Sequence, residues 1–306
     1  MVVRADDTLS TLTQKVEKAT ILGTLQATLT DFCYLRPIWK ENTEEEALLG
    51  VSLTGIMDNV VMSGGGSLED INTFSNGKLN TLEEVLTYLK QVAIDTNKEW
   101  ASKLGINQSA AITCIKPSGT VSQLVDSASG IHPRYSPFYI RTVRADIKDP
   151  LAKFMTKAGF PVEPCAMKPT TTQVFSFPQR APEGSVCVSD VGAMEQLKLW
   201  KIYQDYWCEH KPSITVYYKD SEFLEIGQWL YNHFDDVSGV SFLPYSEHTY
   251  QQAPYQDCDE GTYNQWLNKM PQNVDWSKLG EFEKEDGTKG SKELACSAGV
   301  CELVDL

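Results

Sequence analysis

Hydrophobic side chains recur at helical spacing near the start of the chain. Residues 8–33 are predicted to form a helix because their apolar positions fall on one face, at Leu12, Val16, Ala19, Leu22 and Leu25. Thr43 and Glu46 form a Thr-x-x-Glu capping box, which predicts the start of a second helix. The same signal recurs at Thr81 and Glu84, ahead of a long amphipathic stretch.

We expect residues 1–108 to be a mainly helical segment that packs on the rest of the fold. Short β-rich runs appear after this segment. They are AAITCIKP, SPFYIRTVRA, TTQVFSFP, SITVYYK and SGVSFLPY, and the helical stretches DPLAKFMTKAG, SDVGAMEQLKLWKIYQDYWCEH and SEFLEIGQWLYNHF lie between several of them. This alternation predicts an α/β fold, a parallel or mixed sheet or a barrel, over residues 109–280. The helix after Asp190 carries an apolar stripe that we expect to face the core: Val191, Met194, Leu197, Trp200, Tyr203 and Trp207.

The composition restricts the class of protein. With 306 residues, 42% of them hydrophobic and 22% charged, the chain can form one or two globular domains. Its formal charge of −14 disfavours long-range attraction to nucleic acid or to an anionic membrane. The chain has no secretory start and no apolar run long enough to span a bilayer. We therefore expect a cytoplasmic protein, in which thiols stay reduced unless they are catalytic.

In the last segment, residues 281–306, charged residues, Gly and Ser dominate, and we expect a mobile tail. Cys296 and Cys301 lie in it with four residues between them. The pair could be half of a zinc site, a disulfide staple or a redox shuttle. A shuttle is favoured, because no second Cys or His pair completes a zinc site and so short a loop constrains little. As a flexible chain, the segment from Glu281 would carry the pair over about 20 Å.

The other cysteines are scattered singly, which is typical of small core residues: Cys33, Cys114, Cys165, Cys187, Cys208 and Cys258. We expect Cys33 to occupy a helix core position and Cys114 to lie in the core of a strand. The histidines, His132, His210, His233 and His248, show no metal-ligand spacing, so no metal site is expected.

The segment ITCIKPSGTVSQLV is the most informative stretch inside the chain. It predicts a strand, a turn from Lys116 to Thr120, and the start of a helix. Such a turn offers unpaired backbone N–H groups, hydroxyls and a positive helix end, which suit an anionic phosphate. It fits equally well a plain strand–turn–helix in which Ser118 or Thr120 caps the helix. The residues alone leave both interpretations open.

His132 and Arg134, in SGIHPRYSPFYIRTVRA, are candidates for a catalytic or substrate-facing role. A structural role is favoured for the arginines. Arg134, Arg141 and Arg144 would then be strand residues that face solvent or structural carboxylates.

Several motifs together resemble one family. These are KPSGTVSQL between a strand and a helix, SASGIHPRYSPFYIRTVR, HKPSITVYY, GVSFLPYSEHTYQQAPY, the terminal Cys-x4-Cys and the opening run LLGVSLTGIMDNV. In this order they resemble the adenosylcobalamin-dependent (class II) ribonucleotide reductases, in their monomeric ribonucleoside-triphosphate reductase branch. The resemblance covers most of the chain and implies the C-terminal half of the family's ten-stranded α/β barrel.

The resemblance also implies site residues and partners. Ser118, Gly119, Thr120, Val121 and Ser122 would match the loop that grips the phosphates of the ribonucleotide substrate. Cys296 and Cys301 would match the tail pair that reduces the active-site disulfide and is recharged by a thioredoxin-like reductant. Residues 240–255, from Val240 to Tyr255, would lie near the side where the cofactor adenosylcobalamin docks, with no cobalt ligand assigned.

The family's radical-bearing cysteine loop has no counterpart in this sequence, which has no NPCGE-like run. The resemblance therefore implies an N-terminal partner that carries this cysteine, either in a naturally split enzyme, as phage genes sometimes show, or because the chain is an engineered fragment. Two alternatives use the tail cysteines differently: a free-standing dithiol oxidoreductase, and a binding module whose cysteines take a metal from a partner.

Overall fold

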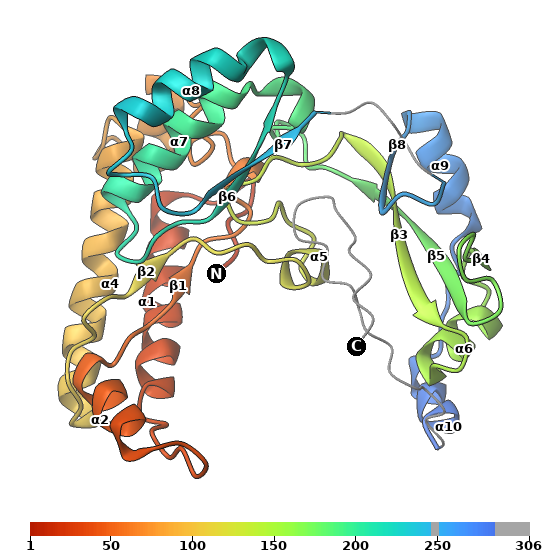
Figure 1. Cartoon of the computed structure of the whole chain (residues 1–306), viewed down its shortest axis with the longest axis horizontal. Helices are drawn as coiled ribbons and strands as arrows, with labels where there is room; N and C mark the ends of the chain where they lie inside the picture. The colour runs from red at the N-terminus through yellow and green to blue at the C-terminus, as the bar shows by residue number, and fades with distance from the viewer. Residues whose placement is uncertain (246–250, 285–306) are drawn as a thin grey trace. The chain divides into compact units, whose positions relative to one another are not determined.

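The computed structural model describes residues 1–245 and 251–284 (Figure 1). The contacts within the chain define two compact units. Unit 1 comprises Met1–Arg134 and Pro182–Tyr245, and unit 2 comprises Tyr135–Ala181 and, among the described residues, 251–284. These boundaries differ from the predicted ranges, because the segment that enters unit 2 leaves unit 1 and returns to it.

The N-terminal part of unit 1 is helical, as the hydrophobic pattern indicates. Its elements are α1 (Leu9–Gln26), α2 (Pro37–Glu46), η1 (Ile56–Asp58), α3 (Leu68–Ser75) and α4 (Leu82–Leu104). Helices α1 and α4 pack against each other through fully buried side chains, which include Leu12 and Val16 on α1 and Val85, Leu86 and Leu89 on α4. The long helix α4 begins where the capping signal predicts it: the Thr81 hydroxyl accepts a hydrogen bond from the N–H of Glu84 at 3.2 Å.

The second predicted helix start is wrong. Helix α2 begins earlier, with Pro37 in its first turn, and it ends at Glu46 instead of beginning near Thr43. The chain turns at Ala47, whose φ is +44°, and the N–H of Leu49 then bonds the carbonyl of Ala111 at 3.0 Å. Strand pairing with a distant segment therefore ends the helix where the local sequence favours its continuation.

Two further expectations in this region are corrected. Helix α1 ends at Gln26 rather than continuing to residue 33. Cys33 is exposed in the turn that follows, so it does not occupy a helix core position.

The rest of unit 1 alternates strands and helices. Its elements are β1 (Val51–Ser52), β2 (Thr113–Cys114), α5 (Val121–Leu124), η2 (Val188–Asp190), α7 (Ala193–Tyr206), β6 (Ile214–Tyr218), η3 (Asp220–Glu222), α8 (Phe223–Asn232) and β7 (Val240–Pro244). Strands β1 and β2 form one parallel pair, and β6 and β7 form another. Four residues of the predicted stripe are confirmed as core, since Leu197, Trp200, Tyr203 and Trp207 have no exposed surface. Met194 and Val191, which precedes α7, are half-buried.

Unit 2 contains a four-stranded antiparallel sheet in the order β4-β5-β3-β8. The strands are β3 (Phe138–Asp146), β4 (Val162–Pro164), β5 (Thr172–Arg180) and β8 (Tyr255–Asp257), and the helices are α6 (Pro150–Lys157), α9 (Glu260–Lys269), η4 (Trp276–Lys278) and α10 (Leu279–Phe282). Helix α10 extends into the range expected for the tail, and its Phe282 packs edge-on against Phe154 at 5.6 Å. The described strands form two parallel pairs in unit 1 and one antiparallel sheet in unit 2, and half of a ten-stranded barrel stays a prediction.

The described residues offer neither a membrane span nor a metal cluster. No helix among the described residues is both long enough and apolar enough to cross a membrane. In residues 1–245 and 251–284, no three His, Cys, Asp or Glu side chains gather in a way that could hold a metal ion.

Candidate functional site

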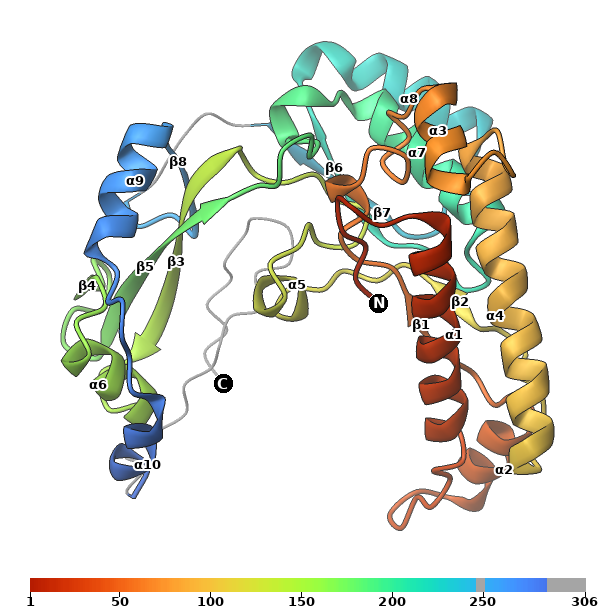
Figure 2. The ribbon, with the colours of Figure 1, turned by 180° about the vertical axis from the view of Figure 1, so that it is seen from behind.

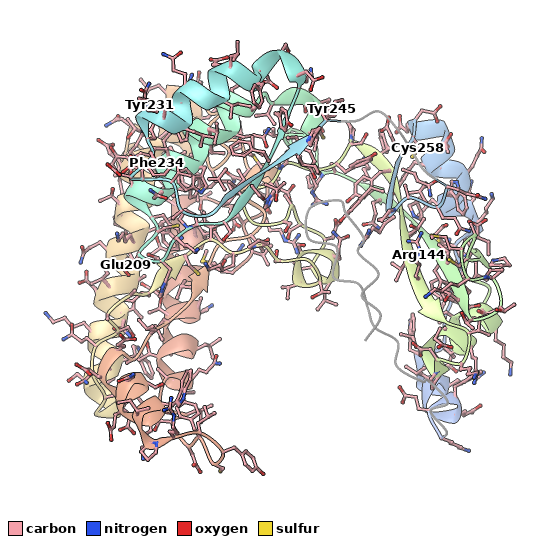
Figure 3. All side chains as sticks on the ribbon, viewed as in Figure 1. Arg144, Glu209, Tyr231, Phe234, Tyr245 and Cys258 are labelled. Carbon is pink, nitrogen blue, oxygen red and sulfur yellow. The ribbon has the colours of Figure 1, made fainter. Side chains whose placement is uncertain are left out.

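The predicted phosphate loop follows the parallel pair of β1 and β2 in unit 1. Thr113 of β2 lies opposite Val51 of β1. The carboxylate of Glu209, whose position is shown in Figure 3, fixes the approach to β2 by accepting a hydrogen bond from the N–H of Ile112 at 2.7 Å. The Thr113 hydroxyl donates to the carbonyl of Trp207. The strand that leads into the loop is therefore anchored to the end of α7.

Thr54, just after β1, joins the two ends of the loop. Its buried Oγ1 atom accepts a hydrogen bond from the N–H of Gly130 at 2.9 Å and donates one to the carbonyl of Ala128 at 2.9 Å. The same atom lies 2.8 Å from the Oγ atom of Ser118. Because the Thr54 hydroxyl has one hydrogen, which Ala128 receives, the hydrogen between the two hydroxyls comes from Ser118. Ser118 therefore uses its donor inside the chain.

Ser122 is likewise engaged within the loop. It has no exposed surface, and its hydroxyl donates to the carbonyl of Ser118. Its own carbonyl accepts from the N–H of Ser127 at 2.9 Å, and the N–H of Ser118 donates to the Oγ atom of Ser129 at 3.1 Å. The Ser118 and Ser122 side chains thus hold the loop in shape.

Gly119, Thr120 and Val121 form the open part of the loop. All three are exposed, and no hydrogen bond among the described residues uses their backbone N–H groups. A Cβ atom added at Gly119 would meet nothing within 4 Å. Helix α5 begins at Val121 and makes a single turn, shorter than the sequence suggests. Consecutive free N–H groups in a loop can bind an anion, so the groups of this loop that are available to an anion are main-chain N–H groups rather than the serine hydroxyls.

Lys116 supplies the nearest positive charge in the sequence. It is exposed, and its Nζ atom donates to the carbonyl of Lys211 at 3.0 Å. Its backbone N–H donates to the Oγ atom of Ser52 at 3.1 Å. The lysine is therefore held beside the parallel strands, at the start of the loop.

The far end of the loop turns back at Asp126, a non-glycine residue with a φ of +46°. The Arg4 guanidinium donates to the carbonyls of Val125 and Asp126. Arg134 donates to the Asp126 carboxylate at 3.0 Å and to its carbonyl at 3.2 Å. Two arginines from distant parts of the sequence therefore stabilise this left-handed turn.

Arg134 also forms a buried ion pair with Asp58. The Nε and Nη2 atoms of the arginine lie 2.8 and 2.9 Å from the two carboxylate oxygens, and the side chains are 3% and 1% exposed. The same carboxylate accepts hydrogen bonds from the N–H of Ala128 at 2.9 Å and from the Ser185 hydroxyl at 3.2 Å. This bidentate, fully bonded geometry is that of a structural charge pair. The structural interpretation of Arg134 is therefore the one that fits.

His132 is also used inside the fold. Its Nε2 atom accepts a hydrogen bond from the N–H of Thr215 at 2.9 Å, so that nitrogen carries no proton. Its Nδ1 atom lies 2.8 Å from the carbonyl of Ser129 and donates to it. Burial lowers the pKa of the imidazole, which favours this neutral form. Both ring nitrogens are occupied, so His132 can neither ligate a metal nor contact a substrate in this arrangement.

Cys114, Cys165 and Cys187 are buried, as expected for core residues, whereas Cys208 and Cys258 are half-buried. Burial raises the pKa of Cys114, and burial also raises that of Cys208. For Cys165, burial opposes ionisation, but hydrogen bonds from the backbone of Lys168 and Met167 and from Arg144 lower its pKa. The other two predicted site residues, Cys296 and Cys301, lie outside the described residues.

The segment expected near the cofactor is only partly described. Residues 246–250, which include His248, lie outside the described residues. In unit 2, the carbonyl of Pro254 accepts a hydrogen bond from Arg141 at 3.1 Å. The carbonyl of Gln252 accepts a hydrogen bond from the Arg144 guanidinium at 2.9 Å. Arg144 lies on β3 and is labelled in Figure 3. The Arg141 guanidinium also lies over the Tyr255 ring, 4.3 Å from its centre.

The pairing is incomplete, since the buried Nε atom of Arg141 has no hydrogen-bond partner among the described residues. In unit 1, Tyr245 just after β7 presents an aromatic side chain that is 43% exposed. The position of the segment near a cofactor stays a prediction.

Sequence reasoning missed the residues that hold the loop: Thr54, Asp58 and Arg4. One local signal marks the region, since Gly55 has a φ of +82° and a Cβ atom there would lie 2.3 Å from the carbonyl oxygen of Val3. A glycine after a short strand thus indicates a close backbone approach, but it does not reveal the hydrogen bonds of Thr54.

Comparisons with known proteins show what this chain is similar to. No family model matches the chain. It is 31% identical over 244 residues to the adenosylcobalamin-dependent ribonucleoside-triphosphate reductase of Euglena gracilis. The aligned region covers 78% of this chain and 32% of that protein. It is 32% identical over 265 residues to a probable enzyme of the same name from Dictyostelium discoideum, covering 84% of this chain and 32% of that protein.

A solved structure gives the same result for the fold. The chain superposes on the crystal structure of a B12-dependent (class II) ribonucleotide reductase with a TM-score of 0.73 at 23% identity, covering 89% of this chain and 40% of that one. The fold is thus an α/β fold like that of class II ribonucleotide reductases. The chain is a homologue of part of the adenosylcobalamin-dependent ribonucleoside-triphosphate reductases, which confirms the resemblance found in its motifs. It spans about a third of the length of the curated relatives that it matches.

Proposed function

We propose that the chain is the part of an adenosylcobalamin-dependent ribonucleotide reductase that binds the substrate phosphates and delivers reducing equivalents, with the radical cysteine on a separate N-terminal partner. The homology to reductases of this name supports the reaction class and the cofactor. The observation that carries the role of this chain is the loop with three consecutive exposed N–H groups at Gly119, Thr120 and Val121.

The substrate is a ribonucleoside triphosphate. Its phosphate oxygens accept hydrogen bonds from the free N–H groups of the loop, and Lys116 supplies a nearby positive charge. Local donors are needed because the chain as a whole, with a charge of −14, repels an anion. The side chains of Ser118 and Ser122 act by holding the loop open.

The reaction replaces the 2′-hydroxyl of the ribose by hydrogen. The C2′–O bond breaks and the hydroxyl leaves as water, a C2′–H bond forms, and two thiols are oxidised to one disulfide. Adenosylcobalamin, when bound, supplies the radical chemistry. Cys296 and Cys301 reduce that disulfide by thiol–disulfide exchange, and a thioredoxin-like reductant restores the tail pair.

The described strands of unit 1 are proposed to be part of a barrel completed by the partner. Both strand pairs of unit 1 are parallel. The N–H of Ser213, just before β6, donates to the carbonyl of Ile115, just after β2, at 3.1 Å. This contact supports a side-by-side arrangement of the two pairs, as expected in one wall of a parallel barrel.

Nucleotide binding by the chain alone tests the loop. Gly119→Asp places a carboxylate where a phosphate would bind, and Gly119→Asn is its uncharged isostere in the same open space. We expect the Asp variant to bind a ribonucleoside triphosphate at least about tenfold more weakly than the Asn variant, since a like charge opposes the phosphate. Equal affinities for the two variants contradict the proposed phosphate site.

Reconstitution tests the function as a whole. The chain is mixed with the N-terminal polypeptide that carries the radical cysteine, adenosylcobalamin, a dithiol and a ribonucleoside triphosphate. Deoxyribonucleotide should form only when both polypeptides are present, and Cys296→Ser should prevent turnover with a thioredoxin-like reductant while leaving it with a small dithiol. If the complete mixture yields no deoxyribonucleotide, the proposed function is wrong.

A further inference from the structure

A second feature of unit 1 lies away from the loop. Large apolar side chains are exposed where α1 ends and α2 begins, and we call this surface the α1–α2 patch. It consists of Leu22, Leu25, Leu29, Tyr34, Ile38 and Trp39. Their side chains are between 45% exposed, for Ile38, and 100% exposed, for Tyr34. Helix α2 lies beside the C-terminal end of α1 in both ribbon views (Figures 1 and 2), so the patch occupies one end of the unit.

Helix α2 is held in place by polar contacts rather than by packing. It buries none of its residues. The Thr30 hydroxyl donates to the Glu44 carboxylate at 2.8 Å, the Asn107 side chain donates to the Glu44 carbonyl at 3.0 Å, and the N–H of Ala110 bonds the Glu46 carbonyl at 2.9 Å. A helix of ten residues is too short to be stable in water without packing. These polar contacts therefore fix the position of α2, and its apolar side chains remain exposed to solvent.

The patch has an acidic border. The residues exposed beside it are the acidic Asp31, Glu41, Glu44, Glu45 and Glu46 and the basic Arg36 and Lys40. Lys40 lies 3.7 Å from the Glu44 carboxylate, and the remaining acidic residues outnumber Arg36, so the border has a net negative charge. A second copy of this chain, with its own charge of −14, would bring like charges together, whereas a surface with basic residues around an apolar centre complements it. Several large apolar side chains exposed on neighbouring segments of the chain are typical of a protein–protein contact.

From these observations we infer that the α1–α2 patch is the docking surface for the polypeptide that carries the remainder of the reductase. This inference rests on the proposed function. About two thirds of the length of the curated relatives lies outside their alignment with this chain, so a large polypeptide is available to cover the patch. That polypeptide presents an apolar surface bordered by Lys or Arg, which faces Tyr34 and Trp39, the aromatic residues of the patch.

Binding to a defined probe tests the docking surface. The probe is the Euglena gracilis reductase from which the segment aligned with this chain has been removed. The test variant is Tyr34→Asp with Trp39→Asp, and the matched control is Tyr88→Asp, which changes a 42% exposed tyrosine on α4 outside the patch. All of these side chains are exposed, so the melting temperature should stay within about 2 °C of that of the unmodified chain.

We expect the unmodified chain and the control to bind the probe, and the double variant to bind at least about tenfold more weakly. Binding should also weaken as the salt concentration rises, because the border of the patch is charged. Equal binding by the double variant, no binding by the unmodified chain, or a dimer of the unmodified chain that the double variant abolishes would each overturn the inference. If the binding test overturns the docking surface but Gly119→Asp still lowers nucleotide affinity, the proposed phosphate site is retained and only the docking surface is rejected.

Discussion

The hydroxyl oxygen of Thr54 lies 2.8 Å from that of Ser118, although 64 residues separate them in the chain. Thr54 is also bonded to Ala128 and Gly130, so one side chain ties the start of the proposed phosphate loop to its return. The open N–H groups between these ends depend on a residue of another element. The loop is therefore a tertiary structure, not a local motif.

Replacing Thr54 by the isosteric valine should loosen the loop. Thr54→Val removes one of the two donors to the Ala128 carbonyl and leaves the buried N–H of Gly130 unpaired, which we expect to lower the free energy of unfolding by about 1–3 kcal/mol. Urea unfolding measures the change. The control, Thr120→Val, alters an exposed hydroxyl and should change stability by no more than about 0.5 kcal/mol. Equal losses in the two variants would show that Thr54 does not hold the loop.

Removing the buried arginine should be among the most destabilising single changes in unit 1. Arg134→Met leaves the Asp58 carboxylate, 1% exposed, without its ion-pair partner, at an expected cost of about 3–5 kcal/mol. Chemical denaturation gives the value, and Arg36→Met, at an exposed arginine, is the control. The added change Asp58→Asn should recover part of the loss, because it removes the unpaired charge. A double variant no more stable than Arg134→Met would contradict the ion-pair interpretation.

The neutral state of His132 predicts a pH dependence of stability. Its pKa is lowered from 6.5 in the folded chain, so above pH 6.5 the imidazole is neutral in both states and its stabilising contribution is fully present. As the pH falls from 6.5 toward the lowered folded pKa, the unfolded chain binds the proton first and stability is lost, by up to about 1.4 kcal/mol for each pH unit.

Comparison with His132→Gln isolates this contribution from other titrating groups. Between pH 7.5 and 5.5, the unmodified chain should lose more unfolding free energy than the variant, as measured by urea denaturation at each pH. Parallel pH profiles would mean that His132 does not titrate differently in the folded and unfolded states.

Thiol labelling should separate the cysteines by their surroundings. Cys33 is exposed, whereas Cys114 is 3% exposed and burial raises the pKa of the Cys114 and Cys208 thiols. Under native conditions at pH 8, iodoacetamide should modify Cys33 at least about tenfold faster than Cys114 or Cys208, since the thiolate is the reactive form. Peptide mass mapping over time follows each site, and labelling in urea shows that all can react. Rapid labelling of Cys114 in the folded chain would refute its assignment to the core.

Much of the fold could be predicted from the sequence, since periodicity reports which face of an element is buried. The core stripe of α7 through Trp200 and Tyr203 and the start of α4 at Thr81 follow from local patterns alone. Where a distant segment overrides the local signal, prediction fails. The Thr43–Glu46 capping box lies at the end of a helix because the chain beyond it pairs with Ala111.

For the site, the sequence by itself determined where the loop lies and which residue types it offers. Only the tertiary structure decided which of those groups are free. The donors of Ser118 and Ser122 are engaged inside the chain, whereas the main-chain N–H groups of Gly119 to Val121 are exposed. The reason is physical: each hydroxyl has one hydrogen, and its direction is set by acceptors that the fold brings from elsewhere in the chain.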